Sequence, residues 1–409
     1  MSTRLRNKII FLTCIFAFAG FGALLYREWF VQKPFAVIVF VADNFGPSQI
    51  SAARIFTGGA GFRFRLESLP HTALASAPAA DYAVADSAAA ATSLASGRTV
   101  NRGSLGLAPD GNPLTTLLET ARAAGRATGL VSNTTLTSPS AAAFYARATT
   151  ADDAPALALQ LVESSALNVI LGGGMNELVP AAQGGARADG RDLLLDLRQR
   201  GFDIVRTREE LDNTPGWRSP QVFGVFADGD LAFVEDQSRY TSQPRLADLV
   251  RRGIELLQFN RKGYLLVVNA GLAGRAAELG RGETLLREMR ELDDAIGAAL
   301  DYAGENSVIL VAGLSSTGGL NLNAFSFAPD RGIAVLGSSP AGVPAITWST
   351  GPGSPASPDT VVLEPVASRT DRPQIVAEDN LVVAIGPGTE PVKGFLDLAT
   401  LGQWLRTML

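Results

Sequence analysis

The sequence predicts an α/β fold with a doubly wound, mostly parallel sheet, helices on both faces and an N-terminal transmembrane helix. Apolar runs typical of buried strands alternate along the chain with segments of helical periodicity, which is the pattern of successive β–α–β units. The chain has 409 residues, of which 46% are hydrophobic and 18% charged, enough for a large core. We find no internal repeat, so a single large domain is the simplest organisation.

The first 26 residues predict a membrane segment. Residues 1–8 form a basic flank that contains Arg4, Arg6 and Lys8, and residues 9–26 are apolar and uncharged. At about 1.5 Å of rise per residue, such a run is long enough to cross most of a bilayer core. The basic flank should stay in the cytoplasm, which places the rest of the chain on the periplasmic side of a cell membrane.

A cleaved signal peptide is the alternative for this segment. Ala17 and Ala19 have the spacing of a cleavage site, but they lie inside the apolar run, which favours an uncleaved anchor. We therefore expect an anchor over residues 9–26, a linker over residues 27–34 and one domain over residues 35–409.

The domain begins with a strand signal. Residues 35–41 form a continuous apolar run, typical of a central strand buried on both faces. Further strands are expected at residues 127–132, 168–171, 221–226, 263–269, 307–312 and 381–385. Helices are expected at residues 48–57, 88–95, 114–123, 152–164, 190–201, 244–260, 283–302 and 398–408. Ligands of such sheets bind at the carboxyl ends of the strands, where Asp43, Asn269 and Gly313 follow predicted strands.

Two segments of the domain carry weaker patterns. Residues 315–372 are dominated by Gly, Ser and Pro, which predicts loops or an irregular insertion. Residues 283–294 mix Glu and Arg at helical spacing, which predicts a solvated helix face.

Composition excludes several classes of function. The net charge is −5 and there is no dense Lys/Arg cluster, so a nucleic-acid partner is not expected. Cys14 is the only cysteine, so no intrachain disulfide can form. The only histidine, His71, is expected to be a half-buried strand residue and not a metal ligand.

Asp86 and Ser87 are the first candidates for chemistry. They precede the helix-forming run at residues 88–95, so they should lie at a helix start. A hydroxyl there faces the positive end of the helix and free backbone N–H groups, which suits phosphate binding and a phosphoserine intermediate. From these residues alone, however, a plain capping pair is the favoured interpretation, and the wider sequence is needed to support a phosphate site.

The wider sequence resembles the alkaline phosphatase family. That family carries T-D-S-A-A-S-A-T at its nucleophile, where this chain has A-D-S-A-A-A-A-T at residues 85–92. Other family elements follow in the family's order, at residues 101–106, 140–146, 171–174, 223–229 and 383–387. The resemblance extends from about residue 35 to the C-terminus and implies the alkaline phosphatase fold.

The resemblance also implies a mechanism. In the family a serine attacks the phosphate ester, two zinc ions activate the serine and the leaving group, a magnesium ion assists, and an arginine holds the phosphate. By this comparison Ser87 is the nucleophile with Asp86 beside it, and Asp43 is a retained metal ligand.

The other ligand positions depart from the family. The magnesium-binding pair becomes Ser138 and Ser140, and the metal-binding glutamate, aspartate and histidine of one segment become Asn269, Gly274 and Glu278. The T-A-D-H element becomes residues 312–315, Ala-Gly-Leu-Ser, and the histidine of H-T-G-E-D falls near Ile375, so that Glu378 and Asp379 alone survive there.

The phosphate-holding arginine of the family aligns with Ala151. Arg147, which replaces a histidine four residues earlier, is therefore the candidate to bind phosphate together with Ser87.

Zinc is not expected, because zinc sites rely on His or Cys with carboxylates. A vestigial pocket without metal is therefore expected, and magnesium or calcium on the oxygen ligands of Asp43, Ser140, Asn269 and Glu278 is the alternative.

Three functions follow from these residues. The leading hypothesis is an extracytoplasmic pseudoenzyme that has lost the zinc site and binds phosphate, a phosphoester or a protein partner. The second is an active phosphatase that uses Ser87 with a reduced, oxygen-ligated metal site. The third is a structural or assembly subunit of a membrane complex.

Overall fold

The computed structural model describes residues 3–26, 33–59, 61–164, 166–216, 221–323, 345–353 and 364–409. Its main sheet contains β1 (Ala36–Ala42), β2 (His71–Ser76), β3 (Ala127–Thr135), β4 (Val169–Gly173), β5 (Asp203–Val205), β6 (Val222–Val225), β7 (Tyr264–Ala270), β8 (Ser307–Gly313), β14 (Asn380–Ile385) and β15 (Gly394–Asp397). The strand order is β15-β2-β14-β8-β1-β7-β3-β4-β6-β5. Within this sheet β14 alone runs against its neighbours, so the sheet is mostly parallel, as predicted.

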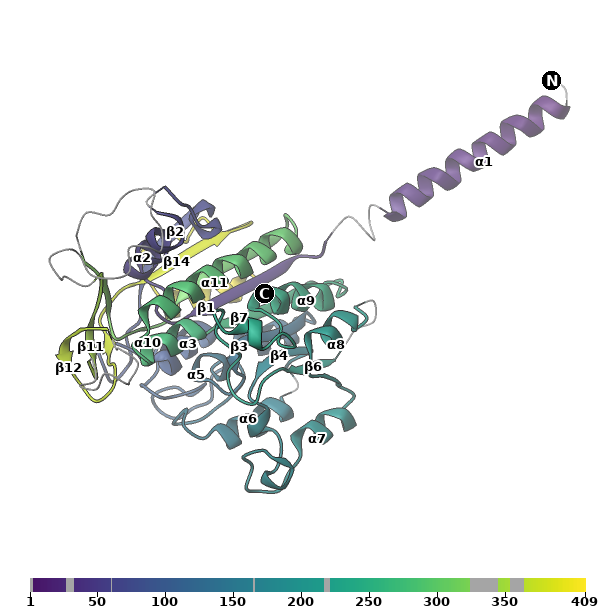
Figure 1. Ribbon diagram of the computed structural model, residues 1–409. Helices are drawn as coiled ribbons and strands as arrows, with labels where there is room; N and C mark the ends of the chain where they lie inside the picture. The colour runs from purple at the N-terminus through teal and green to yellow at the C-terminus, as the bar shows by residue number, and fades with distance from the viewer. Residues whose placement is uncertain are drawn as a thin grey trace.

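Helices cover both faces of this sheet (Figure 1). They are α2 (Pro47–Gly58), α3 (Ser87–Ser96), α4 (Leu117–Ala123), α5 (Pro139–Ala142), α6 (Ala154–Glu163), α7 (Leu193–Gln199), α8 (Arg208–Asn213), α9 (Leu246–Leu257), α10 (Leu272–Glu278), α11 (Gly282–Ala303) and α12 (Leu398–Thr407). Alternate residues of β1 enter two separate cores. Val37 and Val39 pack on the side of α3 and α12, whereas Ile38 and Phe40 pack on the side of α2, α9 and α11. Burial on both faces explains why β1 is apolar throughout.

The predicted strands are all present, and each begins within one residue of the predicted position. The expected ranges did not include β2, the strands β5 and β15 at the two edges of the sheet, or the helices α5, α8 and α10. The edge strands have three and four residues, too few to show a period of two.

The prediction of loops over residues 315–372 was wrong in part. The described residues there form β9 (Ser316–Thr317), β10 (Leu320–Leu322), β11 (Ile346–Gly351) and β12 (Val366–Arg369), and β9 pairs with β13 (Ile375–Val376). β10, β11 and β12 make a small sheet of their own. Trp348 of β11 is buried and donates to Glu364 Oε2 over 2.6 Å. Trp348 is the largest buried side chain of this sheet, and only Leu320 and Ile346 of its described residues are buried hydrophobics beside it, too few to form a hydrophobic pattern in the sequence.

The prediction of a solvated face for residues 283–294 was also wrong. Glu288, Glu291 and Asp293 of α11 are buried, with 4%, 2% and 3% of their surface exposed. Each accepts hydrogen bonds from another part of the chain: Val234 N lies 2.7 Å from Glu288 Oε1, and Leu66 N lies 2.9 Å from Asp293 Oδ1. These carboxylates accept hydrogen bonds from neighbouring segments of the chain. Charged residues at helical spacing look the same in the sequence whether they face solvent or are buried with such partners.

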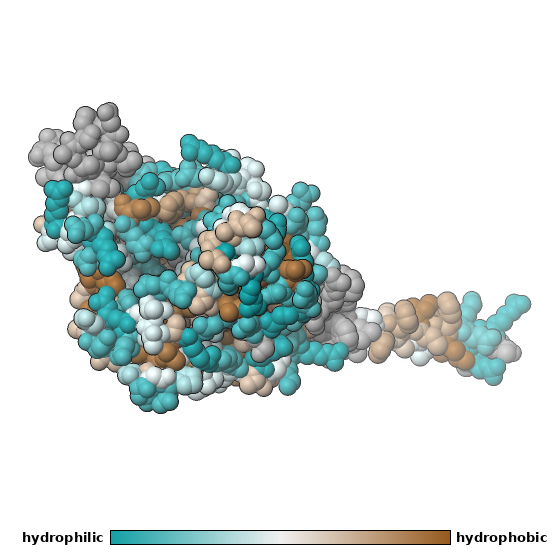
Figure 2. All heavy atoms as spheres, turned by 90° about the horizontal axis from the view of Figure 1, so that it is seen from below, coloured by the Kyte–Doolittle hydropathy of each residue, from teal (hydrophilic) through white to brown (hydrophobic). Residues whose placement is uncertain are grey.

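The N-terminal helix α1 (Thr3–Tyr26) extends away from the domain (Figure 1). The stretch Arg4–Gly22 is long and apolar enough to cross a membrane, and none of it is buried inside the protein. Figure 2 shows apolar side chains along this helix and hydrophilic ones at its N-terminal end. A membrane span and a signal sequence both have these properties.

We predict that Gly402→Ala destabilises the domain. α12 packs on α3 so closely that a Cβ at Gly402 would lie 2.3 Å from the carbonyl oxygen of Leu94, so the two helices must separate. Overpacking of this kind costs roughly 1–3 kcal/mol. Thermal unfolding measures it, with Gly229→Ala as control because its Cβ meets no atom within 4 Å. Equal melting temperatures for the two variants would contradict this packing.

We predict that stability falls as the pH rises from 4.5 to about 8. Burial raises the pKa of Glu288 from 4.5 to about 8, and the nearby Glu291 and Glu235 act in the same direction. The native state therefore keeps a proton that the unfolded state releases, and its stability is lost as the pH rises through the folded pKa.

Glu288→Gln keeps the acceptor for Val234 N and removes this titration. We expect a flatter dependence of the melting temperature on pH, whereas the exposed Glu209→Gln should keep the wild-type slope. An unchanged slope in Glu288→Gln would show that other groups are responsible.

Candidate active site at the carboxyl edge of the sheet

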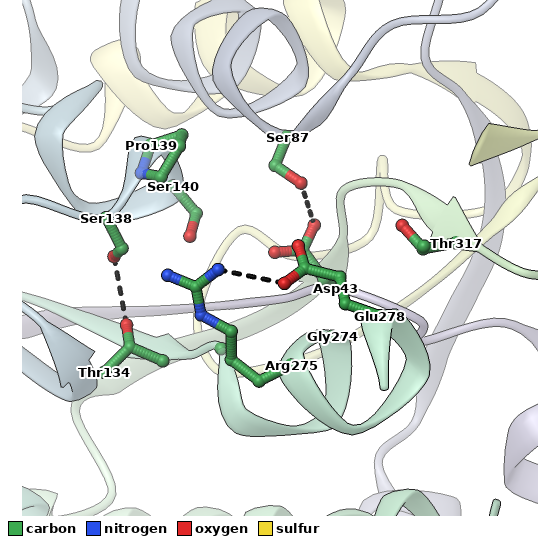
Figure 3. A pocket seen from close by; sticks show the side chains of 11 residues that line it. Asp43, Ser87, Thr134, Ser138, Pro139, Ser140, Gly274, Arg275, Glu278 and Thr317 are labelled. Carbon is green, nitrogen blue, oxygen red and sulfur yellow. Dashed lines mark hydrogen bonds and ion pairs between the residues drawn. The ribbon is translucent and has the colours of Figure 1, made fainter. Parts of the chain in front are cut away.

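A small open pocket lies beyond the carboxyl ends of the central strands (Figure 3). Its lining comes from segments far apart in the sequence: Asp43, Ser87, Thr134, Ser138, Pro139, Ser140, Gly271, Gly274, Arg275, Glu278 and Thr317. Among the sequence-predicted residues, Asp43, Ser87, Ser140 and Glu278 therefore meet in one place. Ligands of doubly wound sheets usually bind at this edge, beyond the carboxyl ends of the strands.

Asp86 positions Ser87. As the N-cap of α3, it accepts a hydrogen bond from Ala89 N over 2.9 Å with one carboxylate oxygen, and from Gly103 N over 2.8 Å with the other. The cap fixes the first turn of the helix and joins it to the loop at residues 101–106. Asp86 is thus occupied with backbone groups and does not line the pocket.

The Ser87 hydroxyl is held by two partners. Its Oγ donates to Asp43 Oδ1 over 2.7 Å (Figure 3) and lies 2.9 Å from Ser315 Oγ. Ser315 Oγ also donates to Asp43 Oδ1, over 2.9 Å. Asp43 and Ser315 follow the neighbouring strands β1 and β8, so their proximity results from strand pairing. Ser315 occupies the position of a family histidine, and here a hydroxyl contacts Asp43 instead.

Burial raises the pKa of Asp43 from 3.8 to about 6. The hydrogen bonds from Ser87 and Ser315 oppose this shift, the negative charge of Glu278 adds to it, and the positive charge of Arg275 opposes it. The carboxylate form is therefore stabilised by donors on this chain.

Asn269 lies deeper than the other candidates. It lies one residue before the end of β7 and is fully buried. Its Nδ2 lies 3.0 Å from both Ser132 Oγ and Thr134 Oγ1 and 3.2 Å from Ser138 Oγ. Its Oδ1 has no hydrogen-bond partner among the described residues. A neutral network of hydroxyls around an amide thus occupies the region where the resemblance places magnesium ligands.

Arg275 is the pocket residue that the sequence comparison missed. It projects from α10, and its Nη1 lies 2.9 Å from Glu278 Oε2 while its Nε lies 3.0 Å from Asp230 Oδ2. Arg275 and Glu278 are three residues apart, so a helical reading of this segment would have placed both on one face.

Gly274 brings α10 against Asp43. A Cβ at position 274 would lie 2.7 Å from Asp43 Cβ, closer than side chains tolerate. The aspartate that the family carries at this position therefore has no room in this packing, because the helix backbone fills the space beside Asp43.

Arg147 was expected to bind phosphate, and the structure does not place it in the pocket. Its Nη2 lies 2.7 Å from both carboxylate oxygens of Glu119 and 3.0 Å from Leu114 O. Glu119 also accepts from Thr116 N over 2.9 Å in the capping box of α4. Arg147 is thus engaged at the start of α4, and the expectation is corrected.

Two other residues also lie outside the pocket lining. His71 begins β2, is half-buried and faces Ala384 across the sheet, as expected of a strand histidine. Glu378 accepts hydrogen bonds from Gln49 Nε2 over 3.0 Å and from Ser316 Oγ over 2.8 Å.

The residues present do not fit the zinc ions of the family. Over the described parts of the chain, no three His, Cys, Asp or Glu side chains are grouped so that they could hold a metal ion. Of the oxygen ligands considered for magnesium or calcium, Glu278 is paired with Arg275, and Asn269 points its amide donor at three hydroxyls.

The fold and the position of Ser87 define the class: an α/β protein whose serine, at the start of a helix, faces an aspartate at the carboxyl edge of the sheet. The alkaline phosphatase family model matches residues 35–342. The chain belongs to the alkaline phosphatase family.

Individual relatives agree with this assignment. The tissue-nonspecific alkaline phosphatase of Rattus norvegicus is 26% identical, over 78% of this chain and 70% of its own length. The alkaline phosphatase of Escherichia coli (strain K12) is 29% identical, over 70% of each chain. The solved alkaline phosphatase of Thermus thermophilus has a TM-score of 0.73 at 24% identity and covers 91% of each chain. That of a Shewanella species has a TM-score of 0.74 at 22% identity, over 92% of this chain and 100% of its own, and these two structures show the fold.

We predict that Ser87→Ala raises the pKa of Asp43 above about 6, because the Ser87 hydrogen bond lowers it. Ser315→Ala should act in the same direction. The pKa is measured by carbon NMR titration of labelled aspartate side chains, with Asp43→Asn to identify the signal.

Ser140→Ala is the matched control for this titration. Ser140 lines the same pocket, but it is not among the groups that shift the pKa of Asp43, which it should leave unchanged. An Asp43 pKa that responds equally to all three serine variants would contradict the hydrogen-bonding pattern.

Proposed function

We propose that this protein is a membrane-anchored, extracytoplasmic member of the alkaline phosphatase family that has lost zinc-dependent phosphate monoester hydrolysis. The observation that carries the proposal is the setting of Ser87. Its hydroxyl is bonded to Asp43 and Ser315, in a pocket where the described residues hold no three metal-binding side chains together.

The chemistry of phosphate esters supports this conclusion. A serine hydroxyl is a weak nucleophile and needs a strong base or a metal ion to activate it. Phosphate monoesters are among the slowest esters to hydrolyse without catalysis, so the loss of two activating metal ions is severe.

The charges of the pocket also oppose a phosphate monoester. Asp43 and Glu278 line the pocket as carboxylates, and Arg275 already pairs with Glu278 and Asp230. A phosphate dianion would enter against this negative charge unless it displaced Glu278 from Arg275. We propose accordingly that phosphate or phosphoester binding at the start of α3 is weak, and that recognition of a protein partner is the main role of the domain.

An active phosphatase with a reduced metal site remains the second candidate. Three oxygen ligands favoured by magnesium or calcium, on Asp43, Ser140 and Glu278, line one pocket together with Ser87. A structural subunit of a membrane complex is the third candidate, supported by α1, which is apolar and unburied.

A p-nitrophenyl phosphate assay on the full-length protein in detergent tests the proposal. We expect no Ser87-dependent turnover with zinc, magnesium or calcium, so that wild type and Ser87→Ala give the same rate, while a zinc alkaline phosphatase is active in the same buffers. Turnover that disappears in Ser87→Ala would overturn the proposal. If magnesium or calcium and Asp43 are also required for that turnover, the second candidate takes its place.

A further inference from the structure

One guanidinium in the pocket is surrounded by carboxylates. Arg275 pairs with Asp230 over 3.0 Å and with Glu278 over 2.9 Å, and its positive charge also acts on Asp43 and Glu177. Two acidic side chains therefore contact this cation, and its charge also lowers the pKa of two more.

The packing directs Arg275 into this position. The absence of a side chain at Gly274 lets α10 lie against Asp43, and the next residue then extends across the pocket. Figure 3 shows the Arg275 guanidinium between the side of the pocket that carries Asp43 and Glu278 and the side that carries Ser138 and Ser140.

Asp230 is itself fixed by the backbone. Its Oδ1 accepts from Thr135 N over 2.8 Å at the end of β3, while its Oδ2 accepts from Arg275 Nε. Arg275 is thus held from one side by a strand end and from the other by Glu278 of its own helix. A planar guanidinium with donors on several edges suits this arrangement, because it can bridge two carboxylates at once.

We propose that Arg275 is the resident cation of this pocket: it compensates Asp43, Asp230 and Glu278 in place of a divalent metal ion and excludes such ions. An arginine is permanently charged and is part of the chain, so part of the negative charge of the pocket is balanced at any metal concentration. A divalent ion would have to enter against the guanidinium charge and take Glu278 from it.

The same argument predicts what removal of the charge does. Without it, the carboxylates of Asp43, Asp230 and Glu278 repel one another. No three acidic side chains of the described residues are grouped so that they could hold a metal ion with Arg275 in place, so a hard cation would have to draw these carboxylates together with the Ser140 hydroxyl. The proposal concerns the charge balance of the site that we propose to be inactive, and its test measures metal binding and stability, not turnover.

The experiment compares the wild type with Arg275→Gln, both as full-length protein in detergent and stripped of metal with a chelator. Thermal unfolding and calorimetric titration with Ca²⁺ and Mg²⁺ are the measurements. We expect no response in the wild type. Arg275→Gln should melt at a lower temperature without metal, recover with Ca²⁺, and bind Ca²⁺ at least about tenfold more tightly than the wild type.

Two control variants isolate the charge. Arg275→Lys keeps a cation and should remain unresponsive to metal. Arg208→Gln removes an arginine that also contacts two carboxylates, Asp212 and Asp248, outside the pocket, and should not create a Ca²⁺ response.

Stabilisation of the wild type by either ion, or the absence of any metal response in Arg275→Gln, would overturn the proposal. If Arg275→Gln does not fold, a triple variant that also carries Asp230→Asn and Glu278→Gln decides. Its folding without metal supports a charge role, and its failure to fold overturns the proposal, since packing is then the role of Arg275. Phosphatase turnover in the wild type would overturn the proposed function alone, because metal binding is measured separately.

Discussion

The burial of β1 on both faces of the sheet is the constraint on which the site depends. Because β1 pairs with β7 on one side and β8 on the other, in register from Ala36 to Ala42, the loops after these three strands must meet at one edge. Asp43 follows β1, α10 follows β7, and Ser315 follows β8. The pocket is therefore a consequence of strand pairing, and its chemistry is decided by which side chains these few loop positions carry.

We propose that those positions carry two different replacements for metal coordination. Around Asn269 the replacement is neutral: an amide donates to three hydroxyls in a buried network. Around Asp43 it is charged, since Ser87 and Ser315 donate to the carboxylate while Arg275 supplies a positive charge nearby. Both arrangements pair buried oxygen atoms with donors or a cation, as burial demands, and Asn269 Oδ1 is the exception, with no partner among the described residues.

The fold was predictable from sequence to the extent that its strands are buried on both faces. The runs that became β1, β7 and β8 are apolar throughout, whereas β5 and β15 are short edge strands with no such signal. In the site, Asp43 and Ser87 could be predicted, because Asp43 follows a clear strand signal and Ser87 lies in a family motif at a clear helix start. Arg275 and Ser315 could not, because a comparison with family ligands records what is lost at a position and not which new contact its replacement makes. The comparison placed Arg147 in the phosphate site, but in the structure Arg147 pairs with Glu119. Glu119 belongs to a helix cap, and its position relative to Arg147 depends on tertiary packing, which the sequence does not reveal.

The stability of this fold does not require the chemistry of its family. The two cores on either side of β1 are built from apolar side chains, and the helix that presents Ser87 is fixed by its cap on Asp86 and by close packing against α12. None of these contacts uses a metal ligand, so replacements of side chains at the carboxyl edge of the sheet do not disrupt the fold. The position of Ser87 at the start of α3 is consequently fixed by the fold and does not depend on a metal ligand. We propose that whether such a serine attacks phosphate depends on the cations in its pocket, and in this chain Arg275 is a cation that lines that pocket.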